Sequence, residues 1–283
     1  MRVAIFSDNF YPELGGIQDS IFSLAKELAR NKHQVDFYVP KATAQDYKVA
    51  GLRFSELNLG KNVTVHRLYS LPYPSPTKQS RFVFPTGLRW MELEKRRPDI
   101  IHTQTFFGVG LEAILAARML KIPIIGTDHW AITEFSHYSP FRREIFSWYS
   151  LQYVSWYYNR CDFVTAPSQS VFKEILKHGF ERPYKVVSNP IETEIFKPVS
   201  NEAEKIKLKA KFKLSPRTIV FAARLATEKR INVIIQAVAR IKKTIPDINF
   251  AVAGHGIAEP ELKSLAKKLG VTENVKFLGT LKP

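Results

Sequence analysis

Two basic side chains stand close together in the second half of the sequence. Arg224 ends an apolar run, TIVFAAR (218–224), and Lys229 follows five residues later, where a helical pattern begins. An arginine fork beside a lysine point charge suits a diphosphate, and the pair could stabilise a departing nucleotide without a metal ion. The turn AGHG (253–256) adds Gly254, where the backbone could approach the same ligand. The alternative is ordinary surface charge and a simple turn between a strand and a helix.

A pair of glycines, Gly15 and Gly16, separates the first apolar run from the first helical pattern. Glycine lets the backbone come close to a ligand, and the free N–H groups at the start of a helix attract phosphate. The G-x-G-x-x-G spacing of dinucleotide-binding folds is absent here, so a dinucleotide site is not expected. A tight turn without a ligand is the alternative.

His129 follows another apolar run, PIIGT (123–127), in the sequence TDHW. A loop histidine can donate or accept hydrogen bonds and can change its charge near neutral pH. A lone histidine of this kind is usually structural, but several polar side chains occupy the same stretch or close the preceding strand. These are Glu134, His137, Tyr138, His102 and Gln104. The grouping favours a functional role for His129.

Several well-known catalytic signatures are missing from the sequence. It has no Asp-x-Asp pair, no His/Cys cluster with the spacing of metal ligands, no phosphate-binding P-loop and no Gly-x-Ser-x-Gly elbow. The sequence therefore predicts no dedicated metal site.

Apolar runs alternate with helical patterns over the first 190 residues, which predicts a parallel sheet covered by helices on both faces. The expected strands are residues 2–7, 34–39, 63–68, 99–103, 123–127, 162–167 and 184–189. The ligands of such sheets bind beyond the carboxyl ends of the strands. The polar residues described above lie in those loops, so they are the candidate site residues.

The alternation restarts after a polar segment that contains Pro190 and Pro198. The expected elements there are strands at 218–224, 249–254 and 275–279, and helices at 228–243 and 260–270. The predicted fold class is α/β, with two Rossmann-like, doubly wound parallel-sheet domains. We expect a first domain at residues 1–190, a linker at 191–200 and a second domain at 201–283. This second domain has too few elements to be complete.

The formal net charge of +16 indicates an anionic partner, which could be a phosphorylated substrate, a membrane surface or nucleic acid. No zinc spacing or RNA-binding aromatic signature accompanies the charge, so nucleic acid is not expected. The single cysteine, Cys161, excludes an intrachain disulfide and fits a reducing compartment, so the expected location is the cytoplasm. The first residues do not resemble a signal peptide, and no apolar run is long enough to span a membrane.

Aromatic and basic residues are mixed in the segment 141–160, which holds eight Phe, Tyr or Trp residues beside Arg142, Arg143 and Arg160. Residues 81–90 have a similar character. Such mixtures suit a segment that rests on anionic lipid headgroups. A buried helix between domains is the alternative.

Three stretches together resemble the retaining GT-B glycosyltransferases, a family that includes glycogen synthase-like and phosphatidylinositol mannosyltransferase enzymes. They are the first strand with its Gly-Gly loop, SNPIETEIFKP (188–198) and FAARLATEKR (221–230). The resemblance covers essentially the whole chain. It implies that Arg224 and Lys229 hold the diphosphate of a nucleotide sugar, with Gly15, Gly16 and Gly254 also on the donor side. The donor, a UDP- or GDP-hexose, would be a substrate, and no cofactor is expected.

The segment 102–138, HTQTFFGVGLEAILAARMLKIPIIGTDHWAITEFSHY, resembles the bacterial diacylglycerol glucosyltransferases more closely. This resemblance implies that His129 is the catalytic histidine near the reacting sugar. It also implies an acceptor side formed by His102, Gln104, Glu134, His137 and Tyr138. The Glu-x7-Glu donor segment of the family would follow the last strand and is absent from this sequence.

The expected function is therefore transfer of a hexose, with retention, from a nucleotide sugar to a lipid acceptor of the diacylglycerol type. The enzyme would be cytoplasmic and peripheral on an anionic membrane surface. One alternative is a soluble glycosyltransferase that acts on a glycan or a small molecule. Another is an inactive half-enzyme that needs a partner chain to supply the missing donor segment.

Overall fold

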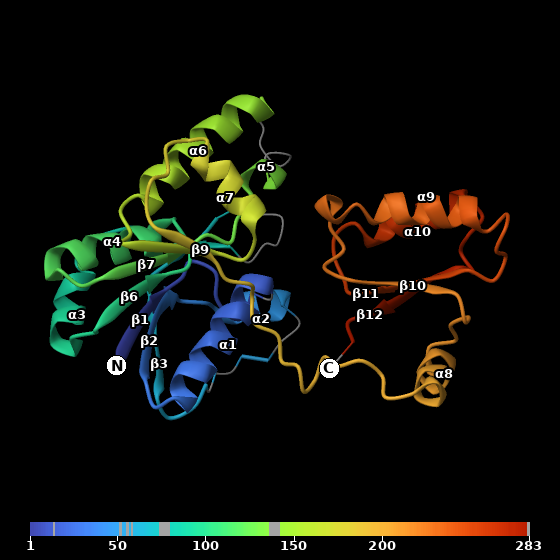
Figure 1. The fold of residues 1–283 in the computed structure, drawn as a ribbon, viewed down its shortest axis with the longest axis horizontal. Coiled ribbons are helices and arrows are strands. Elements are labelled where there is room, and N and C mark those ends of the chain that lie inside the picture. The colour runs from blue at the N-terminus through green and yellow to red at the C-terminus, as the bar shows by residue number, and fades with distance from the viewer. Residues whose placement is uncertain are drawn as a thin grey trace. The chain divides into compact units, whose positions relative to one another are not determined.

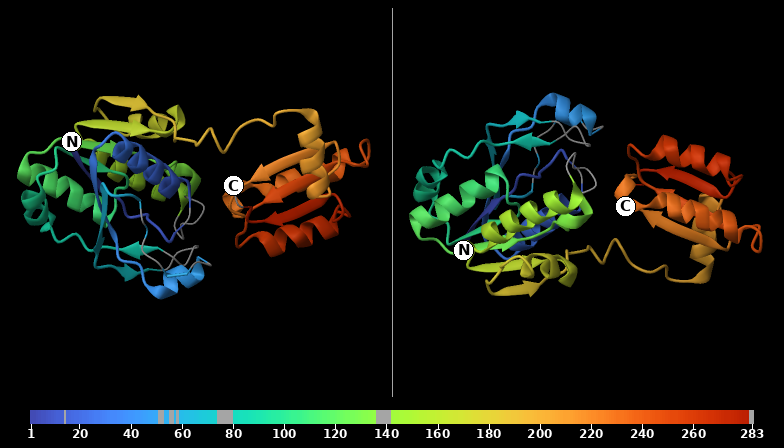
Figure 2. Two further views of the ribbon diagram at one scale, coloured as in Figure 1. Left: turned by 90° about the horizontal axis from the view of Figure 1, so that it is seen from below. Right: turned by 90° about the horizontal axis from the view of Figure 1, so that it is seen from above.

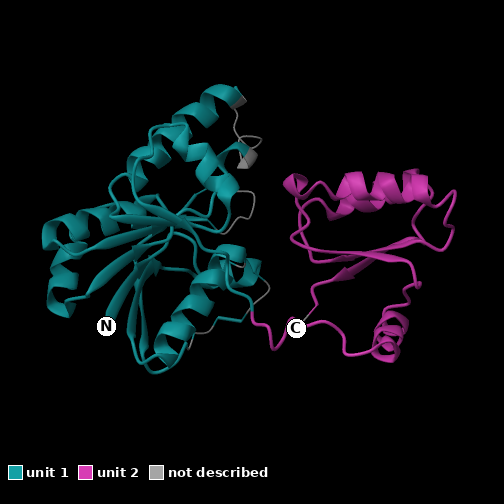
Figure 3. Ribbon diagram, in the orientation of Figure 1, with its two compact units in different colours: residues 1–191 teal, residues 192–283 magenta. Residues whose placement is uncertain are grey.

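The computed structural model describes residues 1–13, 15–50, 53–54, 57, 59–73, 80–135 and 142–281. The chain divides into two units, residues 1–191 (unit 1) and residues 192–283 (unit 2), coloured separately in Figure 3. Each unit has its own parallel sheet and its own hydrophobic core. No helix in the described part of the chain is both long enough and apolar enough to cross a membrane.

Unit 1 is built on a seven-stranded sheet with the order β3-β2-β1-β6-β7-β8-β9, in which all neighbouring strands are parallel (Figure 1). Its strands are β1 (Arg2–Phe6), β2 (Gln34–Pro40), β3 (Val63–Leu68), β6 (Ile100–Thr103), β7 (Ile124–Thr127), β8 (Phe163–Ala166) and β9 (Tyr184–Val186). A separate antiparallel pair is formed by β4 (Leu71–Pro72) and β5 (Arg81–Phe82).

Helices cover both faces of this sheet (Figures 1 and 2). They are α1 (Gly16–Arg30), α2 (Ala44–Val49), α3 (Arg89–Arg96), α4 (Gly108–Leu120), α5 (Ile132–Phe135), α6 (Arg143–Tyr158) and α7 (Gln169–Leu176). Strand β1 shows why two faces are needed, because its side chains alternate between two cores. Val3 and Ile5 pack in the cluster that includes α1, whereas Ala4 and Phe6 pack in the cluster that includes α4.

Helix α6 divides its aromatic residues between two environments. Tyr157 and Tyr158 are fully buried in the core of unit 1, where their rings meet edge to face. Trp148, Tyr149 and Trp156 are 50%, 65% and 43% exposed. The aromatic segment is therefore neither wholly buried nor wholly at the surface: it is a core helix with an aromatic outer face.

Unit 2 has a three-stranded parallel sheet with the order β10-β11-β12. Its elements are α8 (Glu202–Lys211), β10 (Thr218–Ala222), the 3-10 helix η2 (Thr227–Lys229), α9 (Ile231–Ile241), β11 (Asn249–Ala253), α10 (Glu259–Lys268) and β12 (Val275–Gly279). Helices α9 and α10 cover one side of the sheet, and α8 lies on the other side (Figure 1). Helix α8 buries none of its residues.

The structure confirms the predicted α/β class with two parallel sheets, and every predicted strand is present within a few residues of its expected bounds. Two local predictions need correction. No helix was predicted between residue 201 and the strand at 218, but residues 202–211 form α8, which needs no apolar stripe because it buries none of its residues. Lys229 does not begin a long helix but ends η2, two residues before α9 starts.

Candidate functional site

Strands β1 and β6 are neighbours in the sheet, and the chain leaves them in opposite directions. After β1 it continues to β2 on one side, and after β6 it continues to β7 on the other. Such a switch point leaves a crevice at the carboxyl ends of the two strands, where the ligands of open α/β sheets bind. The candidate site of unit 1 is built from the residues that follow these ends.

Asp8, which follows β1, lies with its carboxylate at the start of α4. Its Oδ1 atom accepts a hydrogen bond from the N–H of Val109 at 2.9 Å, and its Oδ2 atom accepts one from Gly110 at 3.3 Å. The hydroxyl of Thr105 also donates to Oδ2, at 2.7 Å. Burial raises the pKa of Asp8 by more than these hydrogen bonds lower it. The N-terminus of α4 is therefore already occupied by a carboxyl group of the chain itself.

His129 and Gln104, both singled out from the sequence, lie side by side. The Nε2 atom of His129 is 2.8 Å from the Oε1 atom of Gln104, whose side chain is 2% exposed. The Nδ1 atom of His129 is buried and has no hydrogen-bond partner among the described residues. Burial lowers the pKa of His129 to about 4, so its imidazole is neutral at neutral pH.

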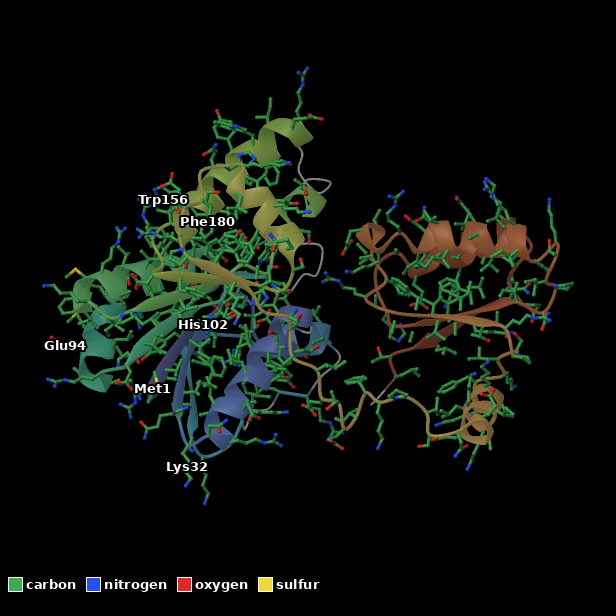
Figure 4. All side chains as sticks on the ribbon, in the orientation of Figure 1. Met1, Lys32, Glu94, His102, Trp156 and Phe180 are labelled. Carbon is green, nitrogen blue, oxygen red and sulfur yellow. The ribbon has the colours of Figure 1, made fainter. Side chains whose placement is uncertain are left out.

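His102, labelled in Figure 4, begins a chain of hydrogen bonds across the sheet. Its Nε2 atom is 2.7 Å from the Oγ1 atom of Thr127, which in turn is 2.7 Å from the Oγ1 atom of Thr165. Burial, and to a lesser extent the charge of His129, lowers the pKa of His102 to about 4. His102 is therefore a neutral side chain that ties β6 to β7 and β8.

Asp128, directly before His129, is completely buried. Its Oδ1 atom accepts a hydrogen bond from the N–H of Trp130 at 3.1 Å, and its Oδ2 atom has no partner within the described ranges. Burial, followed by the negative charge of Glu174, raises the pKa of Asp128 to about 8. This carboxyl group is therefore mostly protonated at neutral pH.

The glycine pair stands where α1 begins. Gly15 is the N-cap residue, and no side chain in the described part of the chain caps this helix. A Cβ atom at Gly16 would meet no heavy atom within 4 Å. The start of α1 therefore has space for a ligand, in contrast to the start of α4, which Asp8 fills.

The other predicted acceptor-side residues are Glu134, His137 and Tyr138. Glu134 belongs to α5, but its side chain lies outside the described part of the structure. His137 and Tyr138 lie outside the described residues altogether.

In unit 2 the predicted donor residues follow the carboxyl ends of β10 and β11. Arg224 comes two residues after β10 and is 49% exposed, with its Nη2 atom 3.7 Å from the Oε1 atom of Glu228. Lys229 is exposed and ends η2. Gly254 has a φ of 130°, and a Cβ atom there would lie 2.0 Å from the carbonyl oxygen of Ala223. Only glycine fits this position, and its close contact brings the AGHG turn against the loop that carries Arg224.

Within the described ranges, no group of three or more His, Cys, Asp or Glu side chains could hold a metal ion.

Comparison with known families places this arrangement. The family model "Glycosyltransferase Family 4" matches residues 14–195, and the model "Glycosyl transferases group 1" matches residues 202–283. The chain belongs to glycosyltransferase family 4. The two matched ranges correspond closely to the two units of the structure. The predicted family is confirmed.

The relatives of this family 4 chain include the two enzymes described next. The alpha-monoglucosyldiacylglycerol synthase of Streptococcus pneumoniae is 28% identical over 287 residues, which cover all of this chain and 62% of that protein. The GDP-mannose-dependent alpha-mannosyltransferase of Corynebacterium glutamicum is 26% identical, over 95% of this chain and 60% of that protein. The chain thus spans less than two thirds of the length of either relative.

Solved structures of other proteins share the fold of this chain. Anabaena Alr3699/HepE, determined in complex with UDP and glucose, has a TM-score of 0.68 at 18% identity, over 99% of this chain and 69% of that chain. WaaG, a glycosyltransferase involved in lipopolysaccharide biosynthesis, has a TM-score of 0.63 at 14% identity, over 99% of this chain and 70% of that chain. The predicted GT-B fold, with its two Rossmann-like sheets, is confirmed.

Two residues of the candidate site in unit 1, Asp8 and Asp128, were not among the predicted site residues. Asp128 directly follows β7, as Gln104 directly follows β6, and Asp8 comes two residues after β1, as His129 does after β7. Their position at the carboxyl ends of β1 and β7 is the signal that could have identified them. Their hydrogen-bond partners could not have been identified, since these lie on other elements.

Proposed function

We propose that this family 4 member transfers a hexose from a UDP- or GDP-hexose to the hydroxyl group of a diacylglycerol-type lipid. The transfer proceeds with retention at the anomeric carbon, on the cytoplasmic face of an anionic membrane. The observation that carries the proposal is the likeness, along the whole chain, to two alpha-monoglucosyldiacylglycerol synthases. The relative from Streptococcus pneumoniae is 28% identical and the one from Acholeplasma laidlawii is 21% identical.

The donor residues of unit 2 suit the departing group. In the transfer, the bond between the anomeric carbon and the diphosphate oxygen breaks, and a bond to the acceptor oxygen forms. The proton of the acceptor hydroxyl leaves with the nucleoside diphosphate or enters the solvent. Negative charge builds up on the diphosphate, and the exposed cations Arg224 and Lys229 would stabilise it.

The state of His129 limits what it can do in this reaction. Because the pKa of His129 is about 4, its imidazole is neutral near neutral pH and cannot act as a general acid. A neutral imidazole can still orient a sugar through a hydrogen bond to a hydroxyl group. We therefore assign His129 a role in holding the reacting hexose.

The outer face of α6 supports action at a membrane surface. Trp148, Tyr149 and Trp156 are about half exposed, and the guanidinium carbon of Arg160 lies 3.7 Å from the centroid of the Trp156 ring. Exposed aromatic rings beside a cation suit the headgroup level of an anionic bilayer.

Replacing Trp148, Tyr149 and Trp156 with serine should weaken sedimentation of the protein with phosphatidylglycerol vesicles. The control change, Ile206→Ser with Leu208→Ser on exposed α8, should not.

The activity is tested by product analysis. The purified chain is incubated with vesicles that contain diacylglycerol and phosphatidylglycerol, together with UDP-glucose or GDP-mannose, and the lipids are examined by mass spectrometry. The proposal expects a hexosyl lipid from the unaltered chain and at least about a tenfold loss in His129→Gln. The matched control His178→Gln, in the loop after α7, should keep its activity. A chain that binds the vesicles and the nucleotide sugar but makes no hexosyl lipid would contradict the proposal.

One relative favours a second candidate function. The D-inositol 3-phosphate glycosyltransferase of Corynebacterium glutamicum is 25% identical over the full length of this chain. A soluble acceptor, such as an inositol phosphate or a glycan, therefore belongs in the same assay without vesicles. A partner chain that completes the donor side also stays a prediction, and native mass spectrometry of the purified protein checks it.

A further inference from the structure

Gln104 and His129 follow different strands, yet their side chains form a direct pair, with Nε2 and Oε1 2.8 Å apart. Gln104 is held firmly in the fold. The backbone N–H of Gln104 donates to the carbonyl oxygen of Phe6 at 2.8 Å, and the side chain is 2% exposed. The residues on either side are also engaged, since Thr103 bonds to the Tyr157 hydroxyl and Thr105 bonds to Asp8.

This contact selects one form of the imidazole. The oxygen of a carboxamide can only accept a hydrogen bond, so the hydrogen must be on Nε2 of His129. A neutral imidazole has a single N–H, which leaves a lone pair on Nδ1. The low pKa of His129, about 4, keeps the ring in this neutral form.

The Nδ1 atom is the unusual feature of the pair. It is buried and has no hydrogen-bond partner among the described residues. A buried acceptor without a partner costs stability, and most such groups in folded proteins are paired. A group that would satisfy Nδ1 must donate a hydrogen bond and must bring no charge into a buried site. A sugar hydroxyl meets both conditions.

We propose that Gln104 is a positioning residue that fixes His129 as the Nε2–H tautomer, so that Nδ1 accepts a hydrogen bond from a hydroxyl group of the bound hexose. Gln104 then acts through His129 and does not contact the acceptor itself. The hydroxyl contact rests on the proposed function, whereas the tautomer can be tested in the free protein.

The tautomer is read directly by nitrogen NMR. The protein is labelled with 15N-histidine, and the signals of His129, one of seven histidines, are assigned with the His129→Gln variant. The free protein should show a protonated Nε2 and an unprotonated Nδ1. Gln104→Met should shift His129 towards a mixture of both tautomers. Gln104→Glu should keep the Nε2–H form and raise the pKa of His129, because a carboxylate stabilises the imidazolium. Gln18→Met, another buried glutamine, is the matched control and should leave His129 unchanged.

Two results would overturn the positioning role. One is a protonated Nδ1 in the unaltered protein, and the other is an unchanged tautomer in a folded Gln104→Met variant.

Kinetics add a second readout. Gln104→Met should lower kcat about tenfold and the nucleotide-sugar KM little. The double variant with His129→Gln should be no slower than His129→Gln alone, since both changes remove one interaction. Additive losses would contradict the coupling.

The hydroxyl contact has its own test. UDP-glucose or GDP-mannose should shift the Nδ1 signal of His129, and UDP or GDP alone should not. If calorimetry shows binding of the nucleotide sugar while Nδ1 stays unchanged, the hydroxyl contact is wrong but the donor proposal stands. If neither nucleotide sugar binds, the donor proposal and the hydroxyl contact both fail, and the tautomer result is unaffected.

Discussion

Asp8 and Thr105 hold each other through two hydrogen bonds. The backbone N–H of Asp8 donates to the Oγ1 atom of Thr105 at 2.8 Å, and the same hydroxyl donates to the Oδ2 atom of Asp8 at 2.7 Å. The two residues are 97 positions apart in the chain and follow the neighbouring strands β1 and β6. The pair therefore ties together the two loops that leave the sheet at the switch point, one of which carries Gln104.

Loss of the Asp8 carboxylate should destabilise unit 1. Asp8→Ala leaves Val109, Gly110 and Thr105 without an acceptor, so we expect a loss of roughly 2–4 kcal/mol in the free energy of unfolding. Asp8→Asn should cost less, because one oxygen remains. Urea denaturation measures both. Asp19→Ala is the control, since this exposed acid lies in the first turn of α1, and it should cost under about 1 kcal/mol. Equal losses at the two positions would contradict the capping role.

Asp128 should make the stability of the protein fall as pH rises. Its pKa is about 8 in the folded state and near 3.8 in the unfolded chain, so the folded state holds a proton that the unfolded state releases. The contribution of Asp128 to the free energy of unfolding is therefore fully present below about pH 4 and is lost as the pH rises towards 8. Asp128→Asn removes this titration. Its Tm should match that of the unaltered protein near pH 4 and exceed it at pH 8, on the order of 5 °C. A constant Tm difference across this range would show that Asp128 is ionised in the fold.

His102 should act in the opposite sense. Its pKa is about 4 in the folded state and near 6.5 when unfolded, so the unfolded state binds the extra proton between these values. The contribution of His102 to the free energy of unfolding is fully present above pH 6.5. It is lost as the pH falls to 4, and the loss is about 3 kcal/mol at most. His102→Gln should flatten the acid side of the curve of Tm against pH. An unchanged slope in this variant would assign the acid sensitivity to other groups, with His129 the first to examine.

The change Gly16→Ala should affect ligand binding without affecting folding. A Cβ atom at this position meets no heavy atom within 4 Å, so Gly16→Ala should keep or slightly raise the Tm. If the diphosphate lies against the start of α1, the same methyl group should weaken UDP-glucose or GDP-mannose binding about tenfold or more. Isothermal calorimetry measures this, with Glu27→Ala further along α1 as the control. Unchanged affinity in Gly16→Ala would remove this glycine from the donor side.

The positions of the strands and most long helices could be predicted from the sequence because their signals are local. The run RVAIF forms β1, and the pattern after Gly16 forms α1, each from residues adjacent in the chain. The place of the site was also predictable, since the loops with Gln104 and His129 follow apolar runs and such loops meet at one edge of a parallel sheet. Where no face is buried, as in α8, the periodic signal is absent and the helix was missed.

The sequence by itself thus determined the fold class, the family and the strand ends at which the chemistry gathers. The tertiary structure alone decided which side chains meet there. Gln104 reaches His129 across 25 positions, and Asp8 caps a helix 101 positions away, because the sheet order places β1, β6 and β7 next to one another. It also decided their charges: burial keeps His129 neutral and Asp128 protonated, and burial is a property of the packed fold, which no local pattern specifies.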